Sequence, residues 1–250
     1  MKRQPLKPSR DSKDMGERGV TAYDVVSRYD DAYFGDLAQR YTGRSRFARS
    51  RIANVLALLP ELAGRKVLDL GCGMGTFTLE SARRGAHAVG IDFMGTAMAA
   101  AGRVARTEGV DGAGFVRGDA AGLPLKAASF DVVIAADFTE HLDDVTLASV
   151  LAETRRVLRK DGTLVLYTPS PTHFLERMRE RGVILRQDSS HIGLRTAEEL
   201  AREVERAGFR VQRRLYLPSH LPILNVAERA LGRWVPLLRR RVGIVAGKAD

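Results

Sequence analysis

The chain has 250 residues, of which 44% are hydrophobic and 28% are charged, so it is large enough for one α/β domain with a sizeable core. Its single cysteine, Cys72, excludes an internal disulfide, and no apolar run approaches the ~18 residues of a membrane-spanning helix. The charged N-terminus is not followed by a hydrophobic segment, so we expect no secretory signal and a cytoplasmic location.

The net charge of +10 is concentrated at the two ends of the chain. Residues 1–60 hold 12 Lys and Arg against 7 Asp and Glu, residues 209–250 hold 9 against 2, and the residues between them hold 19 against 21. A uniformly basic surface would have favoured nucleic acid more strongly. The distribution therefore does not favour a nucleic-acid partner, while contact of the basic ends with phosphates or lipid headgroups stays open.

Residues 1–60 precede the first strand pattern and divide into two parts. Residues 1–19 are polar and basic without an apolar period, which predicts a disordered tail. Residues 20–60 contain two helical patterns, and we expect them to form a helical lid over the ligand site. The first pattern contains Tyr23, Val26, Tyr29, Tyr33 and Phe34, and the second contains Phe47, Ile52, Val55, Leu56 and Leu59.

Residues 61–250 alternate between strand and helix patterns, which predicts one α/β domain with a mostly parallel, seven-stranded sheet and helices on both faces. Strands are expected at 66–70, 86–91, 113–117, 130–136, 163–168, 209–217 and 242–246. Helices are expected at 76–84, 96–108, within 145–159 and at 196–207. Asp161-Gly162 would end the third helix, and Thr196 with Glu199 would begin the fourth as a capping box.

Residues 219–240 form an amphipathic insertion before the last expected strand. Apolar side chains repeat there at helical spacing, and the arginines lie at positions outside that apolar face. One interpretation is a peripheral contact with a membrane, at the inner membrane face. The other is a helix packed on its own domain with its arginines in water. The repeating residues are Ile223, Ala227, Ala230, Leu231, Trp234 and Leu238.

A glycine-rich turn organises the chain around residues 66–76. Three alternate glycines, Gly71, Gly73 and Gly75, follow a short apolar strand and precede a helix, which lets a ligand approach bare backbone at the helix N-terminus. Asp69 lies just before the turn, where a carboxylate would repel a pyrophosphate and attract an ammonium group. Asp92 ends the next strand and is placed to accept hydrogen bonds from two ribose hydroxyls. This arrangement disfavours a nicotinamide dinucleotide.

The turn resembles motif I of the class I S-adenosylmethionine-dependent methyltransferases. Residues 46–208 also resemble the ubiquinone-biosynthesis O-methyltransferase group, because Arg51 lies 20 residues before Gly71 and Asp92 lies 21 after it. Residues 130–141 match that group's fourth strand and its acid-x-x-Glu-His turn, with an aspartate where the group usually has glutamate. The resemblance implies a single Rossmann-like methyltransferase domain and S-adenosyl-L-methionine as its cofactor.

The resemblance also implies which residues contact the cofactor's amino-acid end. Backbone groups of Gly71, Cys72, Gly73 and Gly75 would approach the methionine part. Asp69 would lie near the ammonium group, and Arg51 would pair with the cofactor carboxylate through charge-assisted hydrogen bonds.

The nucleoside end and the reacting centre are expected at the ends of three other strands. Asp92 would bind the ribose, and Phe93 would line the adenine. Asp119 with Ala120 would bind the adenine amino group. Ala136 and Asp137 would face the sulfonium of the cofactor, from which the methyl group leaves.

Histidines are the candidates for catalysis. Deprotonation of a phenol or catechol acceptor needs a general base, and His141 or His191 could serve. Asp137, Glu140 and His141 could hold a divalent ion, with Mg2+ favoured over zinc because carboxylates dominate the set. His173 and His220, in the variable loops, could line a substrate pocket.

We therefore expect an S-adenosylmethionine-dependent methyltransferase (EC 2.1.1 class) that acts on a small-molecule or lipid-like acceptor, at a hydroxyl oxygen. Two alternatives stay open. One is an RNA or protein methyltransferase, although the chain has no recognisable nucleic-acid module. The other is a non-catalytic, cofactor-binding activator subunit, since a complete glycine turn indicates binding but not turnover.

Overall fold

The computed structural model describes residues 45–183 and 190–249. The expected disordered tail at 1–19 and the first helical pattern of the expected lid lie outside the described residues. The second pattern of the lid forms helix α3 (Arg46–Leu56), which begins where the side chain of Ser45 accepts a hydrogen bond from the backbone N–H of Ala48.

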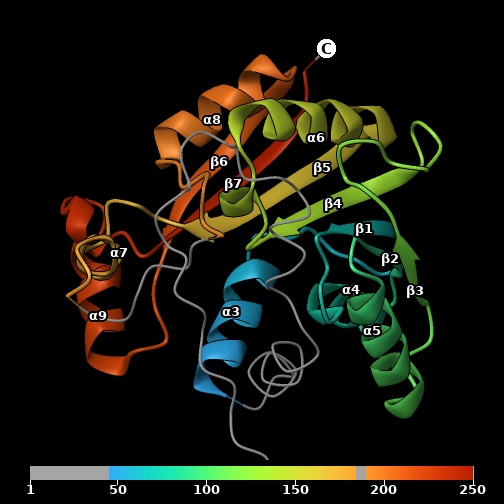
Figure 1. Cartoon of the computed structure of the whole chain (residues 1–250), viewed down its shortest axis with the longest axis horizontal. Helices are drawn as coiled ribbons and strands as arrows, with labels where there is room; N and C mark the ends of the chain where they lie inside the picture. The colour runs from blue at the N-terminus through green and yellow to red at the C-terminus, as the bar shows by residue number, and fades with distance from the viewer. Residues whose placement is uncertain (1–44, 184–189, 250) are drawn as a thin grey trace, which may run out of the picture.

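A seven-stranded sheet forms the centre of the domain (Figure 1). Its strands lie in the order β3-β2-β1-β4-β5-β7-β6. All pairs from β3 to β5 are parallel, and β7 runs antiparallel between β5 and β6. The strands are β1 (Lys66–Leu70), β2 (His87–Asp92), β3 (Ala113–Arg117), β4 (Phe130–Ala136), β5 (Leu158–Pro169), β6 (Phe209–Leu217) and β7 (Arg241–Lys248). The expected mostly parallel, seven-stranded sheet is confirmed.

Helices cover both faces of the sheet, as expected (Figure 1). α3, α4 (Thr76–Ala82) and α5 (Gly95–Thr107) lie on one face, and α6 (Asp144–Val157) and α8 (Ala197–Arg206) lie on the other. Each face has its own apolar core. One core contains Val55, Phe77 and Ile134, and the other contains Leu147 and Leu200. α7 (Phe174–Glu180) and α9 (Pro222–Leu231) lie beyond the end of the sheet that β6 and β7 form.

Two expected element boundaries are wrong. Asp161-Gly162 does not follow a helix end directly, because α6 ends at Val157 and both residues lie within β5. β5 begins at Leu158 and not at the expected residue 163, because Leu158 pairs with Phe130 of β4. The capping box at the start of α8 and the helix end before Gly208 are as expected.

The amphipathic insertion is shorter and more exposed than a helix packed on its own domain would be. α9 ends at Leu231, and a short 3-10 helix, η2 (Pro236–Leu238), follows, so Trp234 lies between the two helices. Ile223 is 90% exposed and Trp234 is 74% exposed, whereas Glu228 is buried. Leu224, Ala227 and Leu238 are half-buried, so this segment packs only part of its apolar face on the domain.

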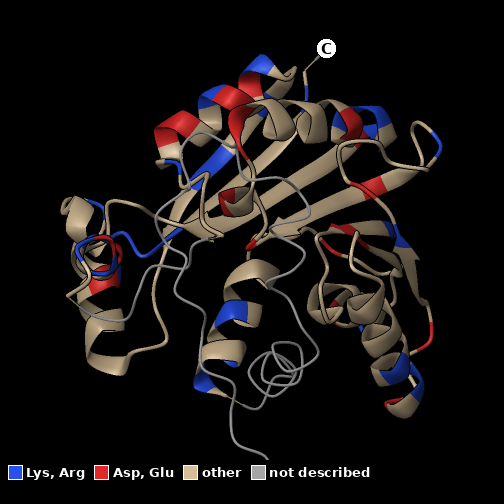
Figure 2. Ribbon diagram, in the orientation of Figure 1, with Lys and Arg blue, Asp and Glu red and all other residues tan. Residues whose placement is uncertain are grey.

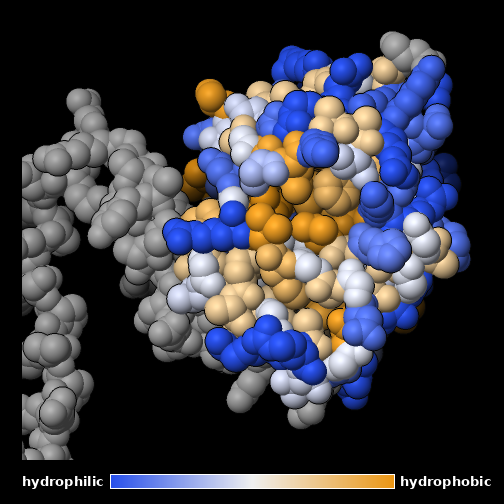
Figure 3. All heavy atoms as spheres, turned by 90° about the vertical axis from the view of Figure 1, so that its right-hand side faces the viewer, coloured by the Kyte–Doolittle hydropathy of each residue, from blue (hydrophilic) through white to orange (hydrophobic). Residues whose placement is uncertain are grey.

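The edge of the sheet at β3 is thinly covered. No helix is assigned in the described connection from β3 to β4, residues 118–129. Figure 3 shows apolar surface at the centre of the face that carries this edge, ringed by hydrophilic residues. Val116 of β3 is 37% exposed.

Candidate functional site

The glycine turn between β1 and α4 leaves an open space at its middle glycine. Gly71, Gly73 and Gly75 all have positive φ angles, of 60°, 50° and 77°. A Cβ at Gly71 would lie 2.3 Å from the Phe138 ring, and a Cβ at Gly75 would lie 2.7 Å from the Phe115 ring. A Cβ at Gly73 would meet no atom within 4 Å. The outer glycines are therefore needed for packing, and the middle one leaves room for a ligand.

Asp92 connects the end of β2 to this turn. Its Oδ2 accepts a hydrogen bond from the Gly73 backbone N–H at 3.0 Å, and its Oδ1 accepts one from the Met94 N–H at 3.0 Å. Burial raises the pKa of Asp92, and these backbone hydrogen bonds oppose the rise. Phe93 beside it is 42% exposed, so its ring is available to an incoming ligand.

Asp69 is fully inside the protein and supports the helix after the turn. Its Oδ2 accepts hydrogen bonds from the Thr78 backbone N–H at 2.9 Å and from the Thr78 hydroxyl at 2.8 Å. Burial raises the pKa of Asp69 to about 7, although Thr78 and Arg51 both act to lower it. The carboxyl is thus tied to α4, and its contact with an ammonium group stays a prediction.

Asp119 and Ala120, predicted for the nucleoside side, and Cys72, predicted for the methionine side, lie in turns or in the core. Asp119 accepts a hydrogen bond from the Ala121 backbone N–H at 2.9 Å, and Ala120 is buried in the core. Cys72 is buried, with its Sγ 4.0 Å from the sulfur of Met98. Burial keeps the pKa of the Cys72 thiol well above its usual value, so Cys72 is not a nucleophile.

Asp137 lies between two arginines at the end of β4. Its Oδ2 pairs with Arg51 of α3, and its Oδ1 accepts a hydrogen bond from Arg241 of β7 at 2.6 Å. Arg51 also reaches the carbonyl of Ala136 at 3.4 Å. Although burial opposes ionisation, Arg241 and Arg51 lower the pKa of Asp137. Asp137 has a φ of +53°, a strained conformation that the two arginines hold in place.

Arg241 could not be found from sequence spacing, because it lies 104 residues from Asp137. The structure shows Arg51 paired with Asp137, so its contact with a cofactor carboxylate stays a prediction.

A second group of polar side chains lies just after Asp137 in the sequence. It consists of Glu140 and His141, together with His191 from a loop that is distant in the sequence. One potential ligand atom of each lies within 4.8 Å of the others, so these residues could hold a metal ion. Asp137 does not join them, because both of its oxygens are bonded to arginines. The predicted set of Asp137, Glu140 and His141 is therefore corrected to one with His191. Two imidazoles and one carboxylate favour a transition metal or zinc, so the expectation of Mg2+ is not supported.

The surroundings of this cluster fix its side chains. Glu140 accepts a hydrogen bond from the Thr168 hydroxyl at 2.9 Å. Burial raises the pKa of Glu140 to about 7, and the nearby Asp137 adds to the rise. The Nδ1 of His141 lies 3.1 Å from the carbonyl oxygen of Ser190. A carbonyl can only accept, so Nδ1 carries a proton and Nε2 of neutral His141 has the lone pair.

The loop that carries His191 is held against this cluster by Arg195. The Arg195 guanidinium donates hydrogen bonds to three backbone carbonyls, those of Thr139, Leu142 and Gly193. Sequence patterns did not identify Arg195, whose role depends on carbonyls that only the folded loop presents.

His173, predicted as a residue of the substrate pocket, is structural instead. It is fully buried, caps α7 and lies 3.1 Å from a carboxylate oxygen of Glu228. His220 does line a hollow, together with Arg51, Tyr167, Arg240 and Arg241.

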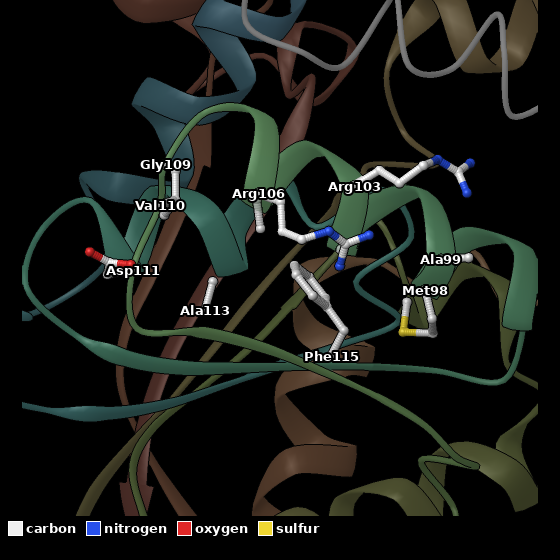
Figure 4. Close-up of a pocket in the computed structure, with 11 residues that line it drawn as sticks. Met98, Ala99, Arg103, Arg106, Gly109, Val110, Asp111, Ala113 and Phe115 are labelled. Atoms are coloured by element: carbon white, nitrogen blue, oxygen red, sulfur yellow. The ribbon is translucent and has the colours of Figure 1, made fainter.

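A hollow of about 770 Å³ lies between α5 and β3, where Figure 4 shows Phe115 pointing toward Arg106. Its residues come from the outer edge of the sheet and include no predicted site residue. The site is therefore identified by the glycine turn and the strand ends, and not by cavity size.

Comparisons with known proteins agree with this fold. Residues 67–162 match the family model described as "Methyltransferase domain". The chain is 37% identical over 151 residues to the ubiquinone biosynthesis O-methyltransferase of Hahella chejuensis, covering 57% of this chain and 62% of that protein. It is 31% identical over 157 residues to the demethylmenaquinone methyltransferase of Thermobifida fusca, covering 59% and 64%. The chain thus spans less than two thirds of these relatives' own length.

Solved structures share the architecture at low sequence identity. A SAM-dependent methyltransferase of Archaeoglobus fulgidus superposes with a TM-score of 0.65 at 22% identity, over 86% of this chain and all of the other. A protein of Pyrococcus horikoshii superposes with a TM-score of 0.67 at 20% identity, over 88% and 100%. The architecture of these solved structures and the match of residues 67–162 to a methyltransferase-domain model both agree with the Rossmann-like fold that the sequence predicts.

Proposed function

We propose that the chain binds S-adenosylmethionine and transfers its methyl group to a hydroxyl oxygen of a small or lipid-like acceptor. The observation that carries this proposal is the open space at Gly73 beside the Asp92 carboxylate. Backbone of the turn can approach a ligand there, while Asp92 offers its oxygens to a ribose. The cofactor, when bound, supplies an electrophilic methyl group on a sulfonium, which an acceptor displaces in line.

The chain's own residues then have three tasks in this proposal. Asp92 and Phe93 bind the nucleoside, with Asp119 and Ala120 near the adenine. Arg51 and Asp69 bind the carboxylate and the ammonium group. Each of these contacts orients the reacting atoms, and correct orientation can contribute several kcal/mol to lowering a barrier.

His141 is the favoured general base when no metal ion is bound to its Nε2. The hydrogen bond from Nδ1 to the Ser190 carbonyl leaves Nε2 to accept a proton from an acceptor hydroxyl. His191 lies against it, with ring centroids 5.1 Å apart, and is the second candidate. A hydroxyl target is further supported by the name of the Hahella chejuensis relative, an O-methyltransferase.

The exposed surface of residues 221–237, called here the α9 surface, supports a lipid-like acceptor reached at a membrane. Its only acidic residue, Glu228, points inward and binds the backbone N–H of Ser219, so the exposed charges are those of Arg229 and Arg233. Apolar side chains flanked by arginines suit an anionic bilayer surface. The exposed apolar residues are Leu221, Ile223, Val226, Leu231, Trp234, Val235 and Leu237. No described helix is long and apolar enough to cross a bilayer.

Calorimetry and label transfer test the proposed reaction. S-adenosylhomocysteine should bind and NAD should not, and Asp92→Ala should weaken binding of S-adenosylhomocysteine by about 1–3 kcal/mol. Asp111→Ala, the same change at an exposed acid outside the site, is the control and should leave affinity unchanged. Label from radioactive cofactor should enter an organic-soluble molecule of a cell extract. Label in RNA or protein would favour the macromolecular alternative, and binding without any transfer would favour an activator subunit.

Vesicle flotation tests the membrane contact separately. The wild-type protein should float with vesicles that contain phosphatidylglycerol and less with pure phosphatidylcholine. The double variant Ile223→Ser, Trp234→Ser should stay in the soluble fraction. Val145→Ser is the matched control, because Val145 is 78% exposed on α6, away from the α9 surface. Equal flotation of the wild type and the double variant would reject the contact.

A further inference from the structure

The two edges of the sheet are built differently. Along β6, exposed arginines and an irregular register oppose pairing with a further strand, and Figure 2 shows this strand in blue. These arginines are Arg210, Arg213 and Arg214. Along β3 the register is regular, and the only charged residue, Arg117, is the last one of the strand. The edge formed by residues 113–117, called here the β3 edge, therefore lacks the charges and the irregularity that protect β6.

Backbone groups are available along the β3 edge. In a parallel pair of strands, the backbone groups of alternate residues face the neighbouring strand. The carbonyl of Gly112 accepts a hydrogen bond from β2 at 2.8 Å, and the N–H of Gly118 donates one to β2 at 3.0 Å, so the even-numbered residues face β2. The N–H and C=O groups of Ala113, Phe115 and Arg117 therefore point outward, where they can pair with one further strand.

A hollow flanks the β3 edge on each face of the sheet. The hollow of about 770 Å³ lies on the α5 face, where Phe115 lines it (Figure 4). A second hollow, of about 490 Å³, is lined by Val89 and Phe130, which pack on the opposite face. Gly114 lines this second hollow, and a glycine inside a strand lets another backbone approach closely. Successive side chains of an added strand would enter the two hollows in turn, because they alternate between the faces of a sheet.

The two hollows suit different side chains. The hollow on the α5 face is lined by Arg103 and Arg106, which are exposed and pair with no acidic residue in the described part of the chain. Its lining also contains one acidic residue, Asp111, so its net charge is positive. The second hollow is lined mainly by glycines and by apolar side chains such as Val89 and Phe130. Acidic side chains therefore complement the first hollow, and apolar side chains complement the second.

We propose that the β3 edge is the docking site of an extended segment from a partner protein, in which acidic side chains on one face alternate with apolar side chains on the other. The partner segment extends the sheet by one strand through backbone hydrogen bonds to Ala113, Phe115 and Arg117. A second copy of this chain fits less well, because pairing of two β3 edges brings Arg103 and Arg106 of both copies together. This docking site is independent of the proposed reaction.

Synthetic peptides test the proposal on the full chain. A fluorescein-labelled heptapeptide of alternating glutamate and valine should bind about tenfold more tightly, in fluorescence anisotropy, than the same peptide with lysine in place of glutamate. A third peptide keeps the composition and charge of the first but has all its glutamates before its valines, and it should also bind about tenfold more weakly. Equal binding of the first peptide and either of the other two would overturn the proposal.

Amide hydrogen exchange of the wild-type protein, followed by NMR, locates the bound peptide without a variant. The alternating peptide should slow exchange at Ala113, Phe115 and Arg117, whose N–H groups point outward, and should change it much less at Gly114 and Val116. Binding without protection of the outward amides, or with protection along β6 instead, would overturn the proposal. Protection that rises with protein concentration in the absence of peptide would identify a second copy as the occupant, which would also overturn it.

Two double variants test the charges of the hollow on the α5 face. Arg103→Gln with Arg106→Gln should weaken binding of the alternating peptide about fivefold, because both cations of that hollow are removed. Arg210→Gln with Arg213→Gln removes the same charge from the exposed β6 edge and should leave the affinity unchanged. An equal loss in the two double variants would assign the binding to net charge and would overturn the proposal.

Discussion

The buried carboxyl of Glu140 makes a quantitative prediction about stability and pH. Its pKa is raised from 4.5 to about 7 in the folded protein by burial and by the neighbouring Asp137. Between these values the folded state binds more protons than the unfolded state, so this group's contribution is largest at low pH and falls as pH rises through 7. Linkage with these two pKa values gives a loss of about 2–3 kcal/mol in the free energy of unfolding between pH 5 and pH 8.

Glu140→Gln removes this titration while keeping an oxygen for the Thr168 hydroxyl. Urea unfolding at pH 5, 6, 7 and 8, with chelator present, should show that the variant loses about 2–3 kcal/mol less than the wild type over this range. Glu205→Gln, on the exposed face of α8, is the control and should follow the wild type. Parallel curves for wild type and Glu140→Gln would refute the reasoning.

Three other predictions follow from the site. Gly73→Ala should abolish S-adenosylhomocysteine binding in calorimetry and lower the melting temperature less than Gly71→Ala does, because both positions have a positive φ but only the Cβ at Gly71 would strike an aromatic ring; the reverse pattern would contradict the assignment of open space. Thr78→Val should cost about 1–3 kcal/mol in the free energy of unfolding, because it removes a hydrogen bond to the buried Asp69, and an unchanged urea midpoint would count against it. Zn2+ or Mn2+ should bind in calorimetry and lose affinity in His191→Asn, while Mg2+ gives no heat; tight Mg2+ binding would show that the corrected ligand set is wrong.

Much of the fold could be predicted because the sequence patterns that specify its elements are local. The glycine turn, the capping box at Thr196 and the apolar runs of the strands each depend on residues within one turn or one strand. The start of β5 was missed because Leu158 is followed by Arg159, Lys160 and Asp161, which a sequence pattern assigns to a loop. Leu158 joins the sheet by pairing with Phe130 of β4, a partner that local patterns do not contain.

The site could be predicted only in part, for the same physical reason. Asp92 was placed correctly at the turn because a parallel strand must end beside its neighbour. The partners of Asp137 could not be found, because Arg51 reaches it from a helix before the sheet and Arg241 from the last strand. His191 joined the metal-ligand cluster through a loop that Arg195 fixes, a contact between distant parts of the chain.

The position of β7 makes one strand important both to the sheet and to the site. β7 follows β6 in the sequence, yet it lies between β5 and β6 in the sheet. Arg241, its first residue, supplies one of the two cations that hold Asp137. A cut just upstream of residue 241 would therefore leave the glycine turn in place, but it would remove an inner strand of the sheet and the Arg241–Asp137 ion pair together.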